Sequence, residues 1–180
     1  MFKKLKNQFQ FNKDETNGNR VRYGKVRDNQ FYGIAYDYLK TESNYRLYEV
    51  IPERYRDKFA LLLMKINCNI APHTDSGILA TINFYVWAKD ATTTFYNITS
   101  SDPVTSQVEN QTNGKIFEMS DLTPYDSFVA EDKEAYILDV TNPHSVTFDG
   151  DPQNRIAFVL QTPHYSYQEV CSMLEETGNL

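Results

Sequence analysis

Cysteines and long apolar runs are both scarce in this sequence. The only 2 cysteines, Cys68 and Cys171, lie far apart in the chain, which excludes a disulfide framework and a paired thiol site for a metal or a redox reaction. No apolar run approaches the roughly 18 residues that a membrane-spanning helix needs, and no secretory leader is recognisable. These absences predict a soluble, cytoplasmic protein that does not act in a membrane.

Positive charge is scarce outside the first 30 residues. Residues 1–30 carry 8 Lys or Arg against 3 acidic residues, a local balance of +5, whereas the whole chain has a net charge of −6, which leaves −11 for residues 31–180. An acidic body argues against nucleic acid as the main substrate, because phosphate binding needs a basic groove. The basic segment 1–30 is either a solvated terminus, packed on the domain or frayed from it, or a contact for nucleic acid or another acidic partner.

The rest of the chain, residues 31–180, has the length and the apolar content of a single domain with a sizeable core. Short apolar runs predict β-strands at 60–70 (one central strand), 80–88, 92–98, 115–119, 127–130, 135–140, 146–148 and 156–160. Residues 31–39 and 45–50 fit either a strand or a helix, and 100–114 fits a surface loop or a mobile flap. A hairpin at Asp149-Gly150-Asp151 is expected to join the last two strands.

Helices are predicted only at Pro52 to Asp57 and in the tail. There Ser166 and Glu169 have the spacing of a capping box, an apolar stripe follows, and Gly178 stops the helix. Many short strands with few helices indicate a mostly-β fold. Composition alone leaves a double-sheet jelly roll and other β-sandwiches open.

Two of the 3 histidines flank strand-like runs together with a carboxylate. His73 and Asp75 are two residues apart, so in an extended strand both side chains fall on one face, and His144 precedes a second apolar run. Two histidines and one carboxylate are the ligand set of non-haem iron(II) oxygenases. Arg155 opens the next strand, and a guanidinium there could hold a carboxylate in a charge-assisted pair. In the alternative interpretation, His73 and His144 are ordinary histidines at strand ends.

The strand at 80–88 alternates in a way that suits a pocket wall. Thr81, Asn83 and Tyr85 share one face, whereas the large apolar residues between them share the other. We expect the first face to meet a polar pocket and the second to meet the core. Lys65, Asn67 and Asn69 would share a face of the preceding strand, where the asparagines could contact a substrate or lie at the rim of a sheet.

The order His-x-Asp, distant His and then Arg resembles the 2-oxoglutarate and iron(II)-dependent oxygenase superfamily. TINFYV at 81–86 resembles the strand that follows His-x-Asp in prolyl-hydroxylase-like members, and Tyr85 falls where that strand offers a tyrosine to the cosubstrate. ATTTF at 91–95 lies where those proteins have a Gly-Gly-x-Thr-x-Phe turn, without the glycines. YILDVTNPHSV at 136–146 resembles the approach to the distal histidine. The resemblance covers roughly residues 60–162.

This resemblance implies a double-stranded β-helix, also called a jelly roll, with iron(II) held by His73, Asp75 and His144. It implies that Arg155 and Tyr85 hold the far carboxylate of 2-oxoglutarate, and that Thr81 and Asn83 belong to the same cosubstrate site. The expected reaction consumes O2, releases succinate and CO2, and hydroxylates the substrate; the presence of Asp75 favours hydroxylation over halogenation.

The resemblance favours a peptidyl or free amino-acid substrate, with a small metabolite or a modified nucleobase as alternatives. Two other functions stay open: a non-catalytic jelly-roll binding module, and a cupin-type metal protein that does not use 2-oxoglutarate. His164, just before the last helix, is expected to be a structural or surface residue. No feature of the sequence specifies an oligomeric state.

Overall fold

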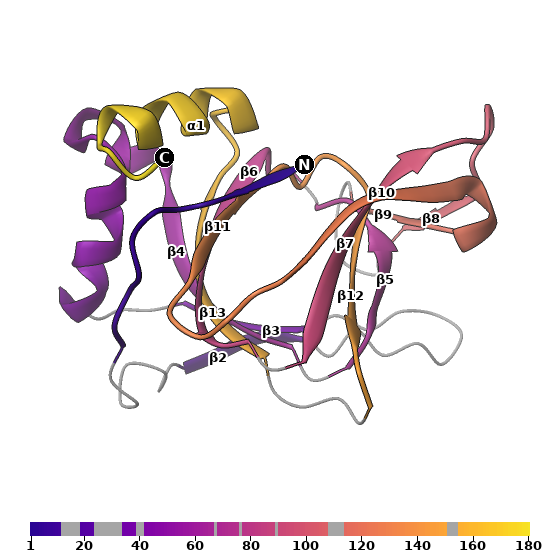
Figure 1. Cartoon of the computed structure of the whole chain (residues 1–180), viewed down its shortest axis with the longest axis horizontal. Helices are drawn as coiled ribbons and strands as arrows, with labels where there is room; N and C mark the ends of the chain where they lie inside the picture. Colours follow the sequence, from indigo (N-terminus) through magenta and orange to yellow (C-terminus); the bar gives the residue numbers. More distant parts are fainter. Residues whose placement is uncertain are drawn as a thin grey trace.

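Two antiparallel sheets face each other in the computed structural model, which describes residues 1–11, 19–23, 34–38, 42–66, 68–75, 77–88, 90–107, 114–150 and 155–180 (Figure 1). The larger sheet contains, in spatial order, β1 (Phe2–Lys4), β11 (Ala135–Leu138), β6 (Ala80–Trp87), β13 (Arg155–Thr162), β4 (Ala60–Ile66), β3 (Ile34–Tyr38) and β2 (Asn19–Tyr23). The smaller sheet contains β10 (Leu122–Val129), β7 (Ala91–Ile98), β12 (His144–Phe148), β5 (Ile70–His73), β9 (Lys115–Phe117) and β8 (Thr105–Gln107).

Consecutive strands repeatedly change sheet. The chain passes from β5 in the smaller sheet to β6 in the larger and back to β7, and it alternates again from β10 through to β13. Apolar residues from the inner faces of both sheets form one buried cluster between them. This arrangement confirms the predicted mostly-β jelly roll.

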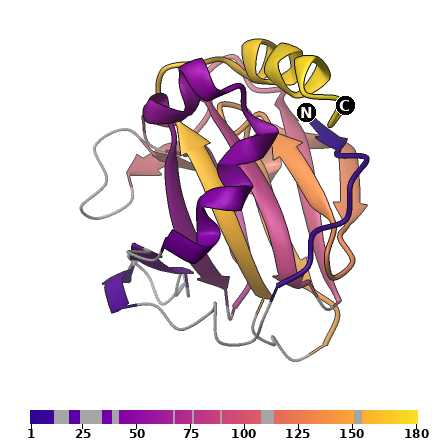
Figure 2. The same ribbon diagram turned by 90° about the vertical axis from the view of Figure 1, so that its left-hand side faces the viewer.

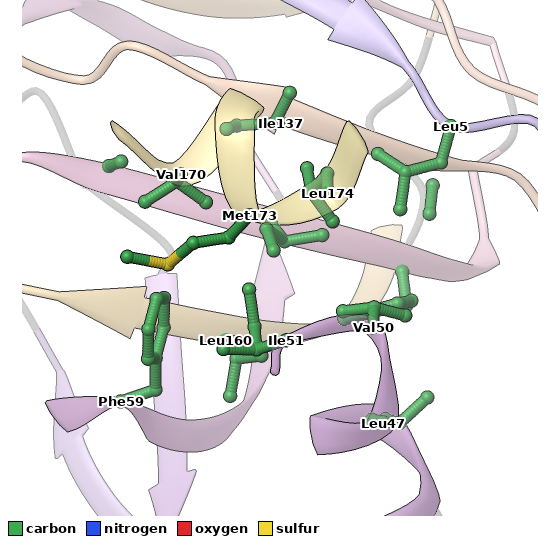
Figure 3. Close-up of a cluster of buried hydrophobic side chains, with 14 of the residues drawn as sticks. Leu5, Leu47, Val50, Ile51, Phe59, Ile137, Leu160, Val170, Met173 and Leu174 are labelled. Carbon is green, nitrogen blue, oxygen red and sulfur yellow. The ribbon is translucent and has the colours of Figure 1, made fainter. Parts of the chain in front are cut away.

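Helices cover the outer face of the larger sheet. The 3-10 helices η2 (Glu42–Val50) and η3 (Glu53–Lys58) lie in front of that sheet in Figure 2, and the α-helix α1 (Tyr167–Glu176) lies over its upper end. Val170 and Leu174 of α1 point toward Leu160 and Ile137 of the sheet in Figure 3, in a second buried cluster. A further 3-10 turn, η4 (Met119–Asp121), precedes β10.

Two local predictions are confirmed. Ile82 and Phe84 of β6 belong to the cluster under the helices, whereas Tyr85 belongs to the cluster between the sheets, as the alternation predicted. Ser166 caps α1 and exchanges hydrogen bonds with Glu169, and Gly178 follows the helix with a φ of 75°. The predicted helix at Pro52 to Asp57 is η3.

The prediction of one central strand over 60–70 is wrong. The run is divided between β4, in the larger sheet, and β5, in the smaller sheet. Ile66 and Ile70 both point into the space between the sheets, so the apolar pattern continues across the break. Cys68 lies in the connecting bend rather than in a strand, and Asn67 lies outside the described residues.

The predicted hairpin around Gly150 is also wrong. β12 pairs with β5 and β7, whereas β13 pairs with β4 and β6, so the two strands belong to opposite sheets. Gly150 has a φ of 90° in the turn that leaves β12; residues 151–154 lie outside the described residues. The chain therefore crosses between the sheets here.

Two segments differ in detail from the predictions, and a third, for which strand and helix were both open, is helical. The expected loop at 100–114 contains the short strand β8, and its residues 108–113 lie outside the described part. β10 begins at Leu122 rather than at 127, with largely exposed residues that carry no apolar signal. Residues 45–50 are part of η2. At the start of the chain, β1 pairs with β11, while the division of the chain at residue 30 stays a prediction.

Among the described residues, no helix combines the length and the apolar composition that a membrane crossing requires.

Candidate metal centre

His73, Asp75 and His144 converge at one end of the smaller sheet. His73 ends β5 and His144 begins β12, and the two residues are direct cross-strand partners with ring centroids 4.4 Å apart. Asp75 lies beyond the end of β5, where its backbone N–H donates to the Val140 carbonyl. Its Oδ1 is 3.4 Å from Nε2 of His73 and 3.8 Å from Nε2 of His144. The three candidate ligand atoms all lie within 4.8 Å of one another, a spacing that could hold one metal ion.

Backbone carbonyls orient both imidazoles. Nδ1 of His73 donates to the Ala71 carbonyl at 2.9 Å, and Nδ1 of His144 donates to the Asn142 carbonyl at 3.0 Å. These bonds turn the Nε2 atoms toward Asp75. Metal-binding histidines are commonly fixed in this way through their second nitrogen.

The protonation states suit a metal. Burial and the neighbouring His73 lower the pKa of His144 to about 4. Burial acts to raise the pKa of Asp75, but the neighbouring imidazoles of His73 and His144 outweigh it, so this pKa lies below its usual value. Near neutral pH, His144 is therefore neutral and Asp75 ionised, which are the forms that coordinate a metal.

Arg155 is a buried cation with incomplete pairing. It begins β13 and is 1% exposed. Its Nη1 donates to Thr93 Oγ1 of the opposite sheet at 3.0 Å, and its guanidinium carbon lies 4.6 Å from the ring centroid of Tyr85. Nε and Nη2 have no hydrogen-bond partner among the described residues. Because unpaired buried donors on a charged group are costly, this arrangement indicates an anionic ligand.

One pocket connects the three candidate metal ligands with Arg155. Its empty volume, including the open mouth, is about 520 Å3, and both sheets line it. Thr81, Asn83 and Tyr85 form part of the wall from β6, as the sequence predicted, and the buried atoms Thr81 Oγ1 and Asn83 Oδ1 have no partner among the described residues. The Asn83 amide donates to the Tyr85 hydroxyl at 3.4 Å.

The strand register gives the depth of the pocket. His144 lies opposite Phe95 of β7, and Val146 lies opposite Thr93, the partner of Arg155. Thr93 thus lies two residues along β7 from Phe95, the residue opposite His144, which is roughly 7 Å at the usual rise of a strand. A small dicarboxylate could span that separation.

Three pocket features were missed by sequence reasoning. Thr93 pairs with Arg155, and its one signal was its place in the ATTTF segment. The Phe95 ring stacks on His144 at a centroid distance of 5.7 Å. Gln161 of β13 lines the pocket beside Thr81, its neighbour in β6.

Two residues that the sequence singled out lie away from the pocket. Asn69 is exposed, and its Oδ1 accepts a hydrogen bond from the Phe148 N–H at 2.9 Å, so its contact is structural. His164 is exposed before α1, as expected for a surface residue.

Comparison with known proteins found no matching family model and no matching curated protein. Similar solved structures include the vicilin of Capsicum annuum, with 10% identity over 79% of this chain and 29% of that chain and a TM-score of 0.40. The vicilin of Solanum melongena has 11% identity over 61% of this chain and 25% of that chain, with a TM-score of 0.36. The epimerase SnoN, solved with Fe3+, alpha ketoglutarate and nogalamycin RO, has 13% identity over 79% of this chain and 67% of that chain, with a TM-score of 0.47. The match thus spans less than a third of either vicilin, and these likenesses carry no argument about function.

Proposed function

We propose that this protein is an Fe(II)- and 2-oxoglutarate-dependent dioxygenase that hydroxylates its substrate. The observation that carries the proposal is the meeting, in one pocket, of a His-Asp-His cluster with a buried arginine, two of whose nitrogen atoms have no hydrogen-bond partner in the described part of the chain. The donor set fits iron(II), because two imidazoles and one carboxylate leave coordination positions for other ligands. The buried guanidinium fits a carboxylate.

The residues divide into two groups by task. His73, Asp75 and His144 would hold the metal, while Arg155, supported by Thr93 and Tyr85, would bind the distal carboxylate of 2-oxoglutarate. Bound iron and 2-oxoglutarate would supply the oxidising chemistry, which reduces O2, releases succinate and CO2 and hydroxylates the substrate. Thr81 and Asn83 line the same pocket, and their buried side-chain oxygen atoms have no partner among the residues that the structure describes.

The protein's own contribution is orientation and exclusion of water. Leu138 and Val140 of the pocket wall are buried, as are Met64 and Ile66 near Arg155. An apolar wall strengthens the pairing of Arg155 with a carboxylate, because few waters compete with it. A peptidyl or free amino-acid substrate and a cytoplasmic location stay predictions from the sequence.

The test is an anaerobic titration with Fe(II) followed by 2-oxoglutarate. We expect the weak visible charge-transfer band of a metal-chelated keto acid. Asp75→Ala should abolish the band by weakening metal binding, whereas Arg155→Gln should retain the metal and weaken 2-oxoglutarate binding. His164→Ala is the matched control, because it removes a histidine that lies outside the pocket.

Each outcome has a distinct meaning. Metal binding without a keto-acid band would contradict the use of 2-oxoglutarate and favour a metal protein of another kind. Absence of metal binding in the folded parent would leave only the non-catalytic jelly roll. If Asp75→Ala and Arg155→Gln both bound like the parent, the assignment of the site would be wrong.

A further inference from the structure

A tight turn outside the pocket holds Tyr85 in place. This turn, residues 131–134, joins β10 to β11. The Tyr85 N–H donates to the Glu134 carbonyl at 2.8 Å, and the Tyr85 carbonyl accepts from the Lys133 N–H at 2.7 Å. Three residues farther on, the Ala88 N–H donates to Asp132 Oδ1 at 2.8 Å. The end of β6 that carries Tyr85 is therefore bound to the 131–134 turn.

The Glu134 carboxylate organises this turn. Glu134 is 5% exposed. Its Oε2 accepts from the Glu131 N–H at 3.1 Å, which closes the turn, and from the Tyr136 hydroxyl at 2.9 Å. Its Oε1 pairs with the ammonium of Lys4 in β1. Lys133 adopts a φ of 74°, a left-handed conformation that is unfavourable for a lysine and needs such support.

Glu134 also reaches the pocket through aromatic rings. The Tyr136 ring that it binds lies edge-on to Tyr85 at a centroid distance of 6.0 Å. The Tyr85 ring in turn lies under the Arg155 guanidinium. Glu134 is thus connected in two ways to Tyr85, the residue that supports Arg155. Its turn forms hydrogen bonds with the Tyr85 backbone, and its carboxylate binds Tyr136, whose ring contacts the Tyr85 ring.

We propose that Glu134 is a positioning residue for the Arg155 end of the pocket, where it holds Tyr85 in the place that presents the guanidinium to a distal carboxylate. The inference rests on the proposed function, because it concerns binding of the dicarboxylate cosubstrate. Glu134 has no contact with His73, Asp75 or His144 among its described interactions, whereas its turn binds the backbone of Tyr85 directly, so we expect its substitution to act first on the Arg155 end of the pocket.

The experiment compares two keto acids that differ only at the distal end. Zn(II)-loaded protein is titrated calorimetrically with 2-oxoglutarate and with 2-oxopentanoate, which has a methyl group in place of the distal carboxylate. We expect Glu134→Ala to weaken 2-oxoglutarate binding roughly tenfold and to leave binding of 2-oxopentanoate and of Zn(II) unchanged. Glu134→Gln, which keeps an acceptor for Tyr136 or Glu131, should recover part of the loss.

Two further variants complete the design. Glu131→Gln is the matched control, because it removes an exposed charge from the same turn, and it should bind 2-oxoglutarate like the parent. Lys4→Met removes the cationic partner of Glu134 from outside the pocket and should weaken 2-oxoglutarate binding in the same direction. If Glu134→Ala does not fold, the same comparison of the two keto acids is made with Lys4→Met.

The outcomes separate this inference from the proposed function. Equal weakening of both keto acids, or unchanged binding of 2-oxoglutarate in the Glu134 and Lys4 variants, would overturn the role of Glu134 alone. A parent protein that binds Zn(II) but not 2-oxoglutarate would overturn the proposed function, and this inference with it.

Discussion

Phe95 shows how one side chain can support His144, a proposed metal ligand, from outside the His-Asp-His cluster. It is fully buried, lies opposite His144 across the β7–β12 pair, and stacks on the imidazole. On the other side, Phe2 of β1 stacks on Phe95 at a centroid distance of 5.8 Å. The rotation of the His144 ring is thus restricted by packing as well as by its hydrogen bond.

We therefore expect Phe95→Leu to weaken metal affinity roughly tenfold, the lower end of the effect of substituting a residue that orients a metal ligand. The cost in unfolding free energy should be on the order of 1 kcal/mol, because the volume is nearly conserved. Phe158→Leu is the control: Phe158 is equally buried, but under the helices. A similar loss of metal affinity in both variants, measured by competition with a chelating dye, would contradict a specific role for Phe95.

Glu134 also makes a prediction about acid stability. Burial acts to raise its pKa, but hydrogen bonds from Lys4, Glu131 and Tyr136 outweigh burial and place the pKa below its usual value. Because the unfolded chain takes up this proton at higher pH than the folded protein, the stabilisation is present above about pH 4.5 and is lost as pH falls through the folded-state value.

Glu134→Gln should accordingly lower the unfolding free energy at pH 7 by roughly 1–3 kcal/mol, the range for hydrogen bonds to a charged group. The difference from the parent should shrink as the pH is lowered toward 3. Urea denaturation at a series of pH values measures both effects. A difference that stays constant across this range would show that ionisation of Glu134 does not contribute.

At the scale of elements, α1 is the clearest case of a structure that local sequence specifies. The Ser166 side chain accepts from the Glu169 N–H, and the Glu169 carboxylate accepts from the Ser166 N–H at 2.7 Å. The buried side of the helix then packs on the larger sheet. The cap fixes where the helix begins, and the apolar stripe fixes which side faces the sheet.

Ser166→Ala should lower the unfolding free energy by about 1 kcal/mol, because it leaves the Glu169 N–H without its acceptor. Ser172→Ala, in the middle of the same helix, is exposed and should be neutral or stabilising by a few tenths of a kcal/mol, since alanine favours helix more than serine. Thermal unfolding of both variants tests the contrast. Equal destabilisation by the two substitutions would contradict the capping role.

At the scale of the whole molecule, the pocket joins the two sheets. The histidines come from the smaller sheet, whereas Arg155 and Tyr85 come from the larger. Ligands that bind only the folded state stabilise it by mass action. A metal ion should therefore stabilise the protein, and 2-oxoglutarate should add stability by linking the sheets.

With free metal at about 100 times its dissociation constant, the gain should be about 2.7 kcal/mol, which for a chain of this size raises Tm by roughly 5–10 °C. Removal of the metal with a chelator should reverse the gain, and 2-oxoglutarate should raise Tm further only while the metal is present. Differential scanning calorimetry of the parent and of Asp75→Ala provides the measurement. A rise of the same size in Asp75→Ala would place the stabilising metal elsewhere.

The sequence by itself determined the features that depend on residues close to one another in the chain. The alternation of β6 assigned Thr81, Asn83 and Tyr85 to the pocket wall, and the spacing of Ser166 and Glu169 placed the start of α1. The order of His73, Asp75, His144 and Arg155 led to the cluster and to the buried arginine that the structure brings into one pocket. These signals are local, because side-chain period and capping depend only on neighbouring residues.

Only the tertiary structure decided which strands pair and what lies beside the pocket. The period of a strand encodes which face is apolar but not which sheet the strand joins, so the run over 60–70 hid its division into β4 and β5. Thr93 meets Arg155 across a separation of 62 residues, and Lys4 meets Glu134 across 130. The first contact forms only when the two sheets close on each other, and the second only when β1 pairs with β11; no local pattern records either of them.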